Sequence, residues 1–385
     1  LLCCGFCRVK SYLTSPGFFR HVIPHRAPEG KELIYIPYWR FKGMLFSCMP
    51  GKIENRFIDT SRQAVASADF PFNIGFRAQT QKLRFAAAET EGTFVKPGVS
   101  FEDIFPKLRE KYSPAPAKSI LYQEFIGDTR SLIYSPFYFN SKLMDAVTNR
   151  PVSNVRPEDL PEEFLQTDRS RGSIHFLAAL CPQCGRDLDG ERDCLVLTCE
   201  NCQSAWWEKR GELVRLKTAH FPEKGDGWVY LPFWRIQADV APVRLETYAD
   251  LVRTANLPRV VQPGWDKIPF RFWNPAFKVR PQNYLTIATS VTLKQPMEKA
   301  VAGPPGGRVH SVTLPLDEAL ETLKLNLANF LRPLERRAEL MPQIDIQPRR
   351  FQLVYIPFQD TRFELIAPRL NLAVNKNVLS HAKNL

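Results

Sequence analysis

The chain has 385 residues, of which 44% are hydrophobic and 12% are aromatic, and its formal net charge is +12. This hydrophobic content excludes a globally disordered chain and allows roughly two or three domains to bury their own cores. No apolar run reaches the ~18 residues that a membrane-spanning helix needs, so we expect no transmembrane segment.

The first 41 residues recur near the middle of the chain at a constant offset of 195. When Leu2–Phe41 is set against Leu197–Ile236 without a gap, ten of forty positions are identical, and they include rare residue types. The matches are Leu2/Leu197, Cys4/Cys199, Cys7/Cys202, Arg20/Arg215, His25/His220, Gly30/Gly225, Tyr35/Tyr230, Pro37/Pro232, Trp39/Trp234 and Arg40/Arg235. The recurrence predicts two copies of one module, each opening with a zinc-type knuckle.

Four segments rich in β-branched and aromatic residues share one phrase around an internal proline, and we expect all four to be strands. The phrase occurs early and late in each half, at Leu33–Trp39, Leu132–Tyr138, Trp228–Trp234 and Leu353–Phe358. Because proline cannot donate to a sheet ladder, each proline is expected at a bulge or a strand edge.

One helix is predicted before the late phrase of each half. The first spans Phe101–Tyr112, with Ser100 as its N-cap and Asp103 as the reciprocal capping residue. The second spans Leu316–Leu331, where leucines at helical spacing indicate a buried face, and Pro333 is expected to end or kink it.

These elements predict an α+β fold that is mainly β, with tandem duplicated β-rich modules, each preceded by a zinc ribbon, of which the first is only partly present. The expected divisions are a partial knuckle and linker at 1–30, a first β-rich module at 31–171, a zinc ribbon at 172–215 and a second β-rich module at 216–385.

Two C-x-x-C pairs in the middle of the chain predict a metal site. Fourteen residues separate the inner cysteines of Cys181/Cys184 and Cys199/Cys202, a spacing typical of zinc ribbons. Four thiolates around zinc leave no open coordination position, so we expect a structural ion. Iron in a rubredoxin-like site would use the same four ligands and stays an alternative. Cys194 lacks a partner at the required spacing and is expected to be a small buried residue.

A second pair, Cys4 and Cys7, matches Cys199 and Cys202 and is the other candidate set of metal ligands. Its companion knuckle would precede Leu1, or His21 and His25 would complete the site, or the pair binds no metal. The spacing of the cysteines is typical of metal ligands rather than of disulfide pairs. We therefore expect a protein of a reducing compartment, the cytoplasm.

Trp39 and Arg40, with their counterparts Trp234 and Arg235, are candidate binding residues. An arginine that follows a tryptophan in both copies suggests a cation–π contact or a buried pair with a carboxylate. The recurring His25 and His220 suggest either a packed histidine or a residue that supports the metal site.

The sequence lacks the phosphate-binding loop, the dinucleotide fingerprint, the H-E-x-x-H helix and the G-x-S-x-G elbow. We therefore expect no enzyme. The Cys181–Cys202 pattern followed by Val229–Trp234 resembles a poorly characterised group of bacterial zinc-ribbon proteins with Y-x-P-[FY]-W strands. That resemblance implies that the four cysteines bind zinc, and some members of the group look like partners of membrane-stress coat proteins.

The expected function is a non-catalytic zinc-ribbon adaptor or assembly subunit that binds partner proteins in a larger complex. The alternative is a nucleic-acid-binding zinc-ribbon protein, because ribbons often serve this role and the charge permits phosphate contacts. Diffuse positive charge also permits peripheral association with an anionic membrane. A catalytic site at the seam between the two halves is the third hypothesis.

Overall fold

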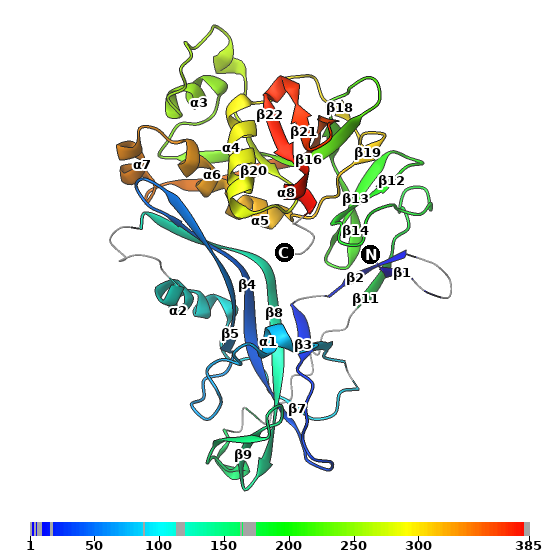
Figure 1. The fold of residues 1–385 in the computed structure, drawn as a ribbon, viewed down its shortest axis with the longest axis vertical. Coiled ribbons are helices and arrows are strands. Elements are labelled where there is room, and N and C mark those ends of the chain that lie inside the picture. Colours follow the sequence, from blue (N-terminus) through cyan, green and yellow to red (C-terminus); the bar gives the residue numbers. More distant parts are fainter. Residues whose placement is uncertain are drawn as a thin grey trace.

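The computed structural model describes residues 2–3, 5, 10–15, 18–87, 89–112, 120–161, 164 and 175–380. The strands within these ranges form two eight-stranded and two three-stranded sheets, so the fold is α+β and mainly β, as predicted. Figure 1 shows the long strands of the first half in the lower part of the molecule and the second half, with most of the helices, above them.

The first large sheet is built on three long strands, β4 (Ile34–Cys48), β5 (Ile53–Gln63) and β8 (Tyr122–Asn140). Apolar residues on the two faces of these strands form two separate buried clusters. The shorter elements are β3 (Phe19–Val22), β6 (Arg84–Phe85), β7 (Thr93–Phe94), β9 (Lys142–Asp145), β10 (Arg150–Ser153), α1 (Arg77–Thr80), α2 (Phe101–Tyr112) and a 3-10 turn at Pro157–Asp159.

The second large sheet is built on β16 (Trp228–Ala241) and β20 (Asp345–Asp360). Its other strands are β15 (Thr218–His220), β17 (Phe272–Pro275), β18 (Val301–Ala302), β19 (Arg308–Val309), β21 (Glu364–Ala367) and β22 (Leu372–Asn375). Its helices are α3 (Tyr248–Thr254), α4 (Pro281–Lys294), α5 (Leu316–Glu321), α6 (Leu323–Phe330), α7 (Leu334–Leu340) and α8 (Lys376–Ser380), with 3-10 turns at Trp265–Lys267 and Pro368–Leu370.

The two large sheets have the same pattern of strand pairing. The long early strand pairs antiparallel with the long late strand, as β4 with β8 and β16 with β20, and both pairs carry a register shift, after Lys42 and after Gln237. In each half the first short strand, β3 or β15, runs parallel to the late strand. Trp39 lies opposite Leu132 and Trp234 opposite Leu353, so the two tryptophans occupy equivalent positions.

The match of His25 with His220 in the ungapped comparison is wrong at the level of structure. In the second half His220 pairs with Tyr355. Tyr134 is the equivalent of Tyr355 in the first half, and it pairs with Val22 instead of His25. The first half has three more residues than the second between this point and its tryptophan, so a constant offset cannot hold here. The two histidines therefore do not occupy equivalent positions.

The four prolines of the repeated phrase lie in long strands, at the points where one neighbouring strand ends and another begins. On β4, β7 pairs up to Tyr35 and β5 begins at Tyr38, so Pro37 lies in the gap between them. Pro136, Pro232 and Pro357 lie in the corresponding gaps along β8, β16 and β20. Each proline thus occupies a local edge, where the missing N–H leaves no ladder partner unsatisfied.

The helix predicted over Phe101–Tyr112 is confirmed with its cap. The amide of Asp103 donates to Ser100 Oγ at 3.2 Å, and the amide of Ser100 donates to Asp103 Oδ2 at 3.3 Å. This reciprocal pair satisfies two N–H groups that the first turn of a helix leaves without partners.

The helical stretch predicted over Leu316–Leu331 is confirmed in its extent, but the chain divides it into α5 and α6 with a break at Thr322. Thr322 Oγ1 donates to Ala319 O at 2.7 Å and accepts a hydrogen bond from Asn274 at 2.9 Å. These tertiary partners favour the break over continuation of the helix. The leucine face is buried as expected, and Pro333 precedes the first residue of α7.

The tip of the β4–β5 hairpin joins the two halves by reaching α7 (Figure 1). Arg337, only 3% exposed, donates to Met49 O at 3.1 Å and also to Pro50 O. Arg130 of β8 forms an ion pair with Glu321 of α5 at 3.0 Å. Three residues of the first half belong to the core of the second: Phe46, Cys48 and Ile126.

Candidate metal centre

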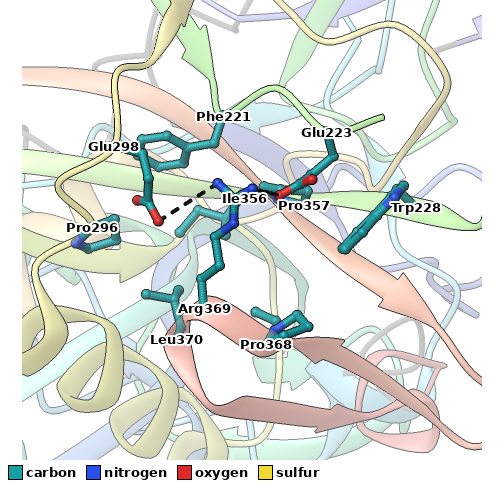
Figure 2. A pocket seen from close by; sticks show the side chains of 11 residues that line it. Phe221, Glu223, Trp228, Pro296, Glu298, Ile356, Pro357, Pro368, Arg369 and Leu370 are labelled. Atoms are coloured by element: carbon teal, nitrogen blue, oxygen red, sulfur yellow. Dashed lines mark ion pairs between the residues drawn. The ribbon is translucent and has the colours of Figure 1, made fainter. Parts of the chain in front are cut away.

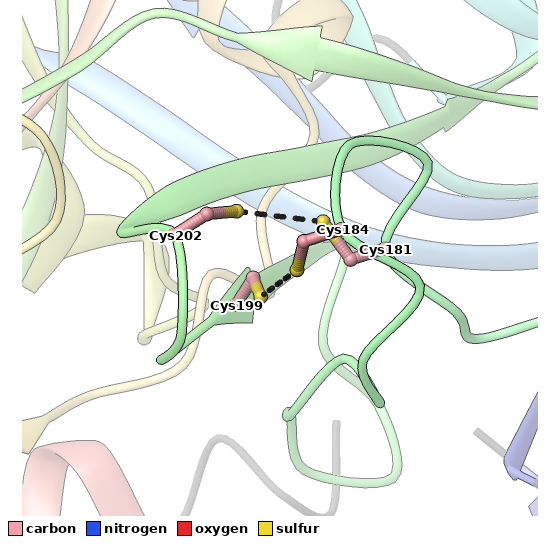
Figure 3. A group of neighbouring side chains, drawn as sticks. All are labelled: Cys181, Cys184, Cys199 and Cys202. Carbon is pink, nitrogen blue, oxygen red and sulfur yellow. Dashed lines mark hydrogen bonds between the residues drawn. The ribbon is translucent and has the colours of Figure 1, made fainter.

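The structure brings together the four cysteines that the spacing predicted (Figure 3). Their Sγ atoms all lie within 4.8 Å of one another. The Sγ atoms of Cys181 and Cys202 are 3.6 Å apart, and those of Cys184 and Cys199 are 3.4 Å apart. A tetrahedral site with metal–sulfur bonds of about 2.3 Å has sulfur–sulfur distances of about 3.8 Å. The four side chains therefore fit one tetrahedral metal ion.

Two tight turns aim the sulfurs at a common point. In the first turn the amide of Gly185 donates to Cys181 O at 2.8 Å, and Gly185 has φ +72°. In the second, Gln203 directly follows Cys202 and has φ +51°. A residue in the left-handed region after the second cysteine turns the chain back, so both thiols of a pair face the same side.

Cys181 and Cys199 are buried, Cys202 is half-buried and Cys184 is exposed. Burial raises the pKa of the Cys181 thiol, but hydrogen bonds from the amides of Gln183 and Cys184 and from Ser204 outweigh it and lower the pKa to about 6. Burial raises the pKa of Cys199 to about 11. A bound dication lowers the pKa of the thiols that coordinate it, so metal binding would release the remaining protons.

Ser204 is a contributor that the sequence did not reveal. Its hydroxyl oxygen lies 2.9 Å from Cys202 Sγ and accepts a hydrogen bond from Trp206 Nε1 at 2.8 Å. The hydroxyl can donate to a thiolate while the indole fixes its position. The only signal in the sequence is a hydroxyl residue two positions after the last cysteine, which is too common to be diagnostic.

The strands that carry this site are β12 (Val196–Cys199), β13 (Ser204–Lys209) and β14 (Glu212–Leu216), and we call residues 179–216 the ribbon. The core of the ribbon is small and includes Ala179, Leu188, Leu197 and Trp206. Trp207 packs on the second large sheet, with ring centroids 6.1 Å from Trp234 and 5.7 Å from Phe351. So small a core needs a further source of stability, which a bound metal would supply.

Cys194 is buried in the ribbon core and does not belong to the four-sulfur group, as expected. Burial raises the pKa of its thiol to about 11, so it stays protonated at neutral pH. It acts as a small apolar residue.

An N-terminal hairpin, β1 (Leu2–Cys3) and β2 (Lys10–Thr14), has the register of the ribbon hairpin. Leu2 pairs with Ser11 as Leu197 pairs with Trp206, at the same offset of 195. Its third strand is β11 (His175–Ala178), which pairs with β2 where β14 pairs with β13. The predicted ligands Cys4 and Cys7 lie outside the described residues.

The N-terminal sheet lies beside the ribbon (Figure 1) and contacts it through side chains. Lys10 forms an ion pair with Asp189 at 2.9 Å, and Thr14 Oγ1 donates to Glu208 at 2.9 Å. Tyr12 packs against the ribbon core. The hairpin and the ribbon thus form one small β assembly.

The paired Trp–Arg positions have different surroundings in the two halves. Trp39 Nε1 donates to Val99 O and Trp234 Nε1 donates to Leu314 O, so both indoles anchor a following loop. Arg40 forms a bidentate pair with Asp59, at 2.9 and 2.7 Å. Arg235 instead lies over the ring of Trp273, with its guanidinium carbon 5.7 Å from the ring centroid. The two arginines therefore do not share one structural role.

Two hollows lie near the second sheet. A cavity of about 180 Å³ is lined by apolar residues and by three charged ones, Arg369, Glu223 and Glu298 (Figure 2). Arg369 pairs with Glu223 at 2.8 Å and with Glu298 at 4.0 Å. A cleft of about 630 Å³ separates the ribbon from the loop of residues 304–312. The acidic residues that neutralise Arg369 fix the turn that follows β21.

Within the described ranges, the four cysteines are the only group of three or more His, Cys, Asp or Glu side chains placed to hold a metal ion. No helix in the same part of the chain is long and apolar enough to cross a membrane. Comparison with known proteins found no matching family model, no matching curated protein and no matching solved structure.

Proposed function

We propose that the four cysteines hold one structural zinc ion and that the chain is a non-catalytic zinc-ribbon adaptor or assembly subunit in a larger complex. The convergence of four sulfurs from two turns carries this proposal. Four protein ligands around zinc leave no position for a substrate or a reactive water. Thiolate sites of this kind stabilise small folds, and here the ribbon packs against the second large sheet through Trp207.

We also propose that the two large sheets arose by duplication of one module. The shared pairing pattern, the register shifts after Lys42 and Gln237 and the equivalent Trp39 and Trp234 support it.

The surface along β5 supports protein binding. Among the described residues β5 pairs only with β4, so its other side is a sheet edge. Phe57 on this strand is 53% exposed, and nearby in the chain Phe72 is 49% exposed and Phe76 is 76% exposed. The segment that follows β5 covers the end of this edge, where Gln63 N donates to Phe72 O at 3.0 Å and Gln79 Nε2 donates to Asp59 O at 3.1 Å. Among the described residues the edge is therefore open only before Asp59, where Phe57 lies, and an exposed aromatic residue beside an open strand edge is typical of a contact surface for another protein.

A native purification tests the adaptor role. The full chain, tagged and produced at its natural level, is cross-linked and its complexes are weighed by native mass spectrometry. We expect a stoichiometric protein partner with cross-links to β5, lost in Phe57→Glu and kept in the control Phe363→Glu, which alters a residue that is 65% exposed in the other half. A lone monomer, or equal loss in both variants, contradicts the proposal.

The second candidate is nucleic-acid binding, favoured by the net charge of +12. If it holds, affinity for a short oligonucleotide falls steeply with salt, because neutralised phosphates release counterions. Binding that stays undetectable at low salt dismisses it.

A further inference from the structure

The two halves differ in charge at one pair of equivalent positions. In the first half Arg40 lies opposite Ser61, and in the second Arg235 lies opposite Trp273. Two residues before Ser61 stands Asp59, which neutralises Arg40; two residues before Trp273 stands Arg271. The position that holds a carboxylate in the first half therefore holds a second guanidinium in the other.

A third arginine completes the group. Arg350 of β20 pairs with Gln237, which is two residues beyond Arg235 on β16. Side chains two apart on a strand share a face, so Arg235, Arg271 and Arg350 lie on one face of three neighbouring chain segments, with Gln237 between them. We call these three residues the arginine cluster.

The cluster makes no ion pair with a carboxylate in the described part of the chain. Arg235 donates to Gln352 Oε1, and Arg271 Nη1 donates to Phe270 O at 2.6 Å. The nearby acid Asp239 is paired with Arg349 at 2.6 Å. Burial lowers the pKa of Arg235 and of Arg271, and the charges of Arg235 and Arg350 lower the pKa of Arg271 further.

A buried donor beside the cluster is also unpaired. The side chain of Trp273 is 1% exposed, and its Nε1 has no hydrogen-bond acceptor among the described residues. The Arg235 guanidinium lies over this ring. The three positive charges on this face lack the negative charge that Asp59 supplies in the first half, and the buried indole N–H next to Arg235 lacks an acceptor among the described residues.

We infer that the arginine cluster is a binding site for a phosphate group, held by the guanidinium groups of Arg235, Arg271 and Arg350. Guanidinium groups match phosphate oxygens with paired N–H donors, and a dianion neutralises more of the cluster than a monocarboxylate. This inference does not depend on the metal or adaptor proposals, because no cluster residue is a cysteine ligand or belongs to β5.

Isothermal titration of the full chain with pyrophosphate, in a chloride background, tests the site. We expect one saturable site, with affinity weakened about tenfold or more in Arg271→Asp, because the new carboxylate pairs with Arg235 and repels the ligand. Arg271→Asp recreates the charge arrangement of the first half, so its melting temperature should equal or exceed that of the parent chain. Arg336→Asp, which makes the same charge change at an exposed position, should bind normally.

Two further arms make the result decisive. Arg350→Gln removes one charge from an exposed residue and should weaken binding even if Arg271→Asp fails to fold. Titration with a short single-stranded DNA distinguishes a phosphate in a polymer from a free phosphate. If the parent chain binds the DNA more tightly than pyrophosphate, and Arg350→Gln weakens both affinities equally, the natural ligand is a polymer. If the DNA binds more weakly than pyrophosphate, the natural ligand is a free anion. No saturable binding of either probe, or equal binding by Arg350→Gln and the parent chain, overturns the inference.

Discussion

Replacement of Asp59 by alanine should destabilise the first large sheet far more than replacement of Arg235 by methionine destabilises the second. Asp59 and Arg40 make two charge-assisted hydrogen bonds, and their side chains are only 11% and 15% exposed, so solvent screens the pair little. Removal of one partner of a buried pair leaves a desolvated charge and costs about 3–5 kcal/mol. Partial exposure places the expected loss near the lower limit, at about 3 kcal/mol.

The double variant Arg40→Met with Asp59→Ala should lose much less than the sum of the single losses, with a coupling free energy of about 2 kcal/mol. Arg235→Met is the matched control in the second half. It removes a cation–π contact that contributes about 0.5–1 kcal/mol and relieves repulsion with Arg271, so the expected loss is under about 1 kcal/mol.

Hydrogen exchange measured by mass spectrometry on the full chain gives the opening free energy of each sheet separately. Peptides from β4 and β5 report Asp59→Ala, and peptides from β16 and β17 report Arg235→Met. Equal losses in the two halves, or additive losses for Arg40 and Asp59, would refute the reasoning from burial and pairing.

Three more predictions concern the metal, the seam and the pH response. Substitution of serine at both Cys181 and Cys184 should abolish the bound metal, as measured by elemental analysis. The same variant should lose protection from hydrogen exchange in residues 181–216, while β20 stays protected. An unchanged metal content would contradict this prediction. Arg337→Met should cost about 3 kcal/mol in urea unfolding, because buried carbonyls lose charged donors, whereas exposed Arg336→Met should change stability by less than about 0.5 kcal/mol. Burial raises the pKa of Glu318 to about 7, so the native state holds a proton that the unfolded chain releases near its ordinary pKa. Burial also raises the pKa of Glu321 to about 7, so stability should fall as pH rises from about 5 to 7 by on the order of 2 kcal/mol from each of the two carboxyl groups. Glu318→Gln should therefore remove about half of that slope; an unchanged slope would exclude Glu318 as one of its sources.

Short-range patterns in the sequence determined the parts of the fold that depend on local chemistry. C-x-x-C spacing fixes a tight turn, so Cys181, Cys184, Cys199 and Cys202 could be assigned to one site before their distances were known. The Ser100 cap predicted the first residue of α2, because the capping bonds span three residues. The four proline phrases predicted strands, because alternating β-branched and aromatic residues suit a pleated surface.

Tertiary structure alone decided the features that join distant residues. An arginine after a tryptophan looks the same in both halves, yet Arg40 meets Asp59 and Arg235 meets Trp273, because the partner is set by the register of a neighbouring strand. The break at Thr322 depends on Asn274, which is 48 residues away in the sequence. The third strand of the N-terminal sheet is β11, which lies far along the chain from β2. Local propensity carries no information on such partners, because these residues come together only when distant strands pair in the folded sheets.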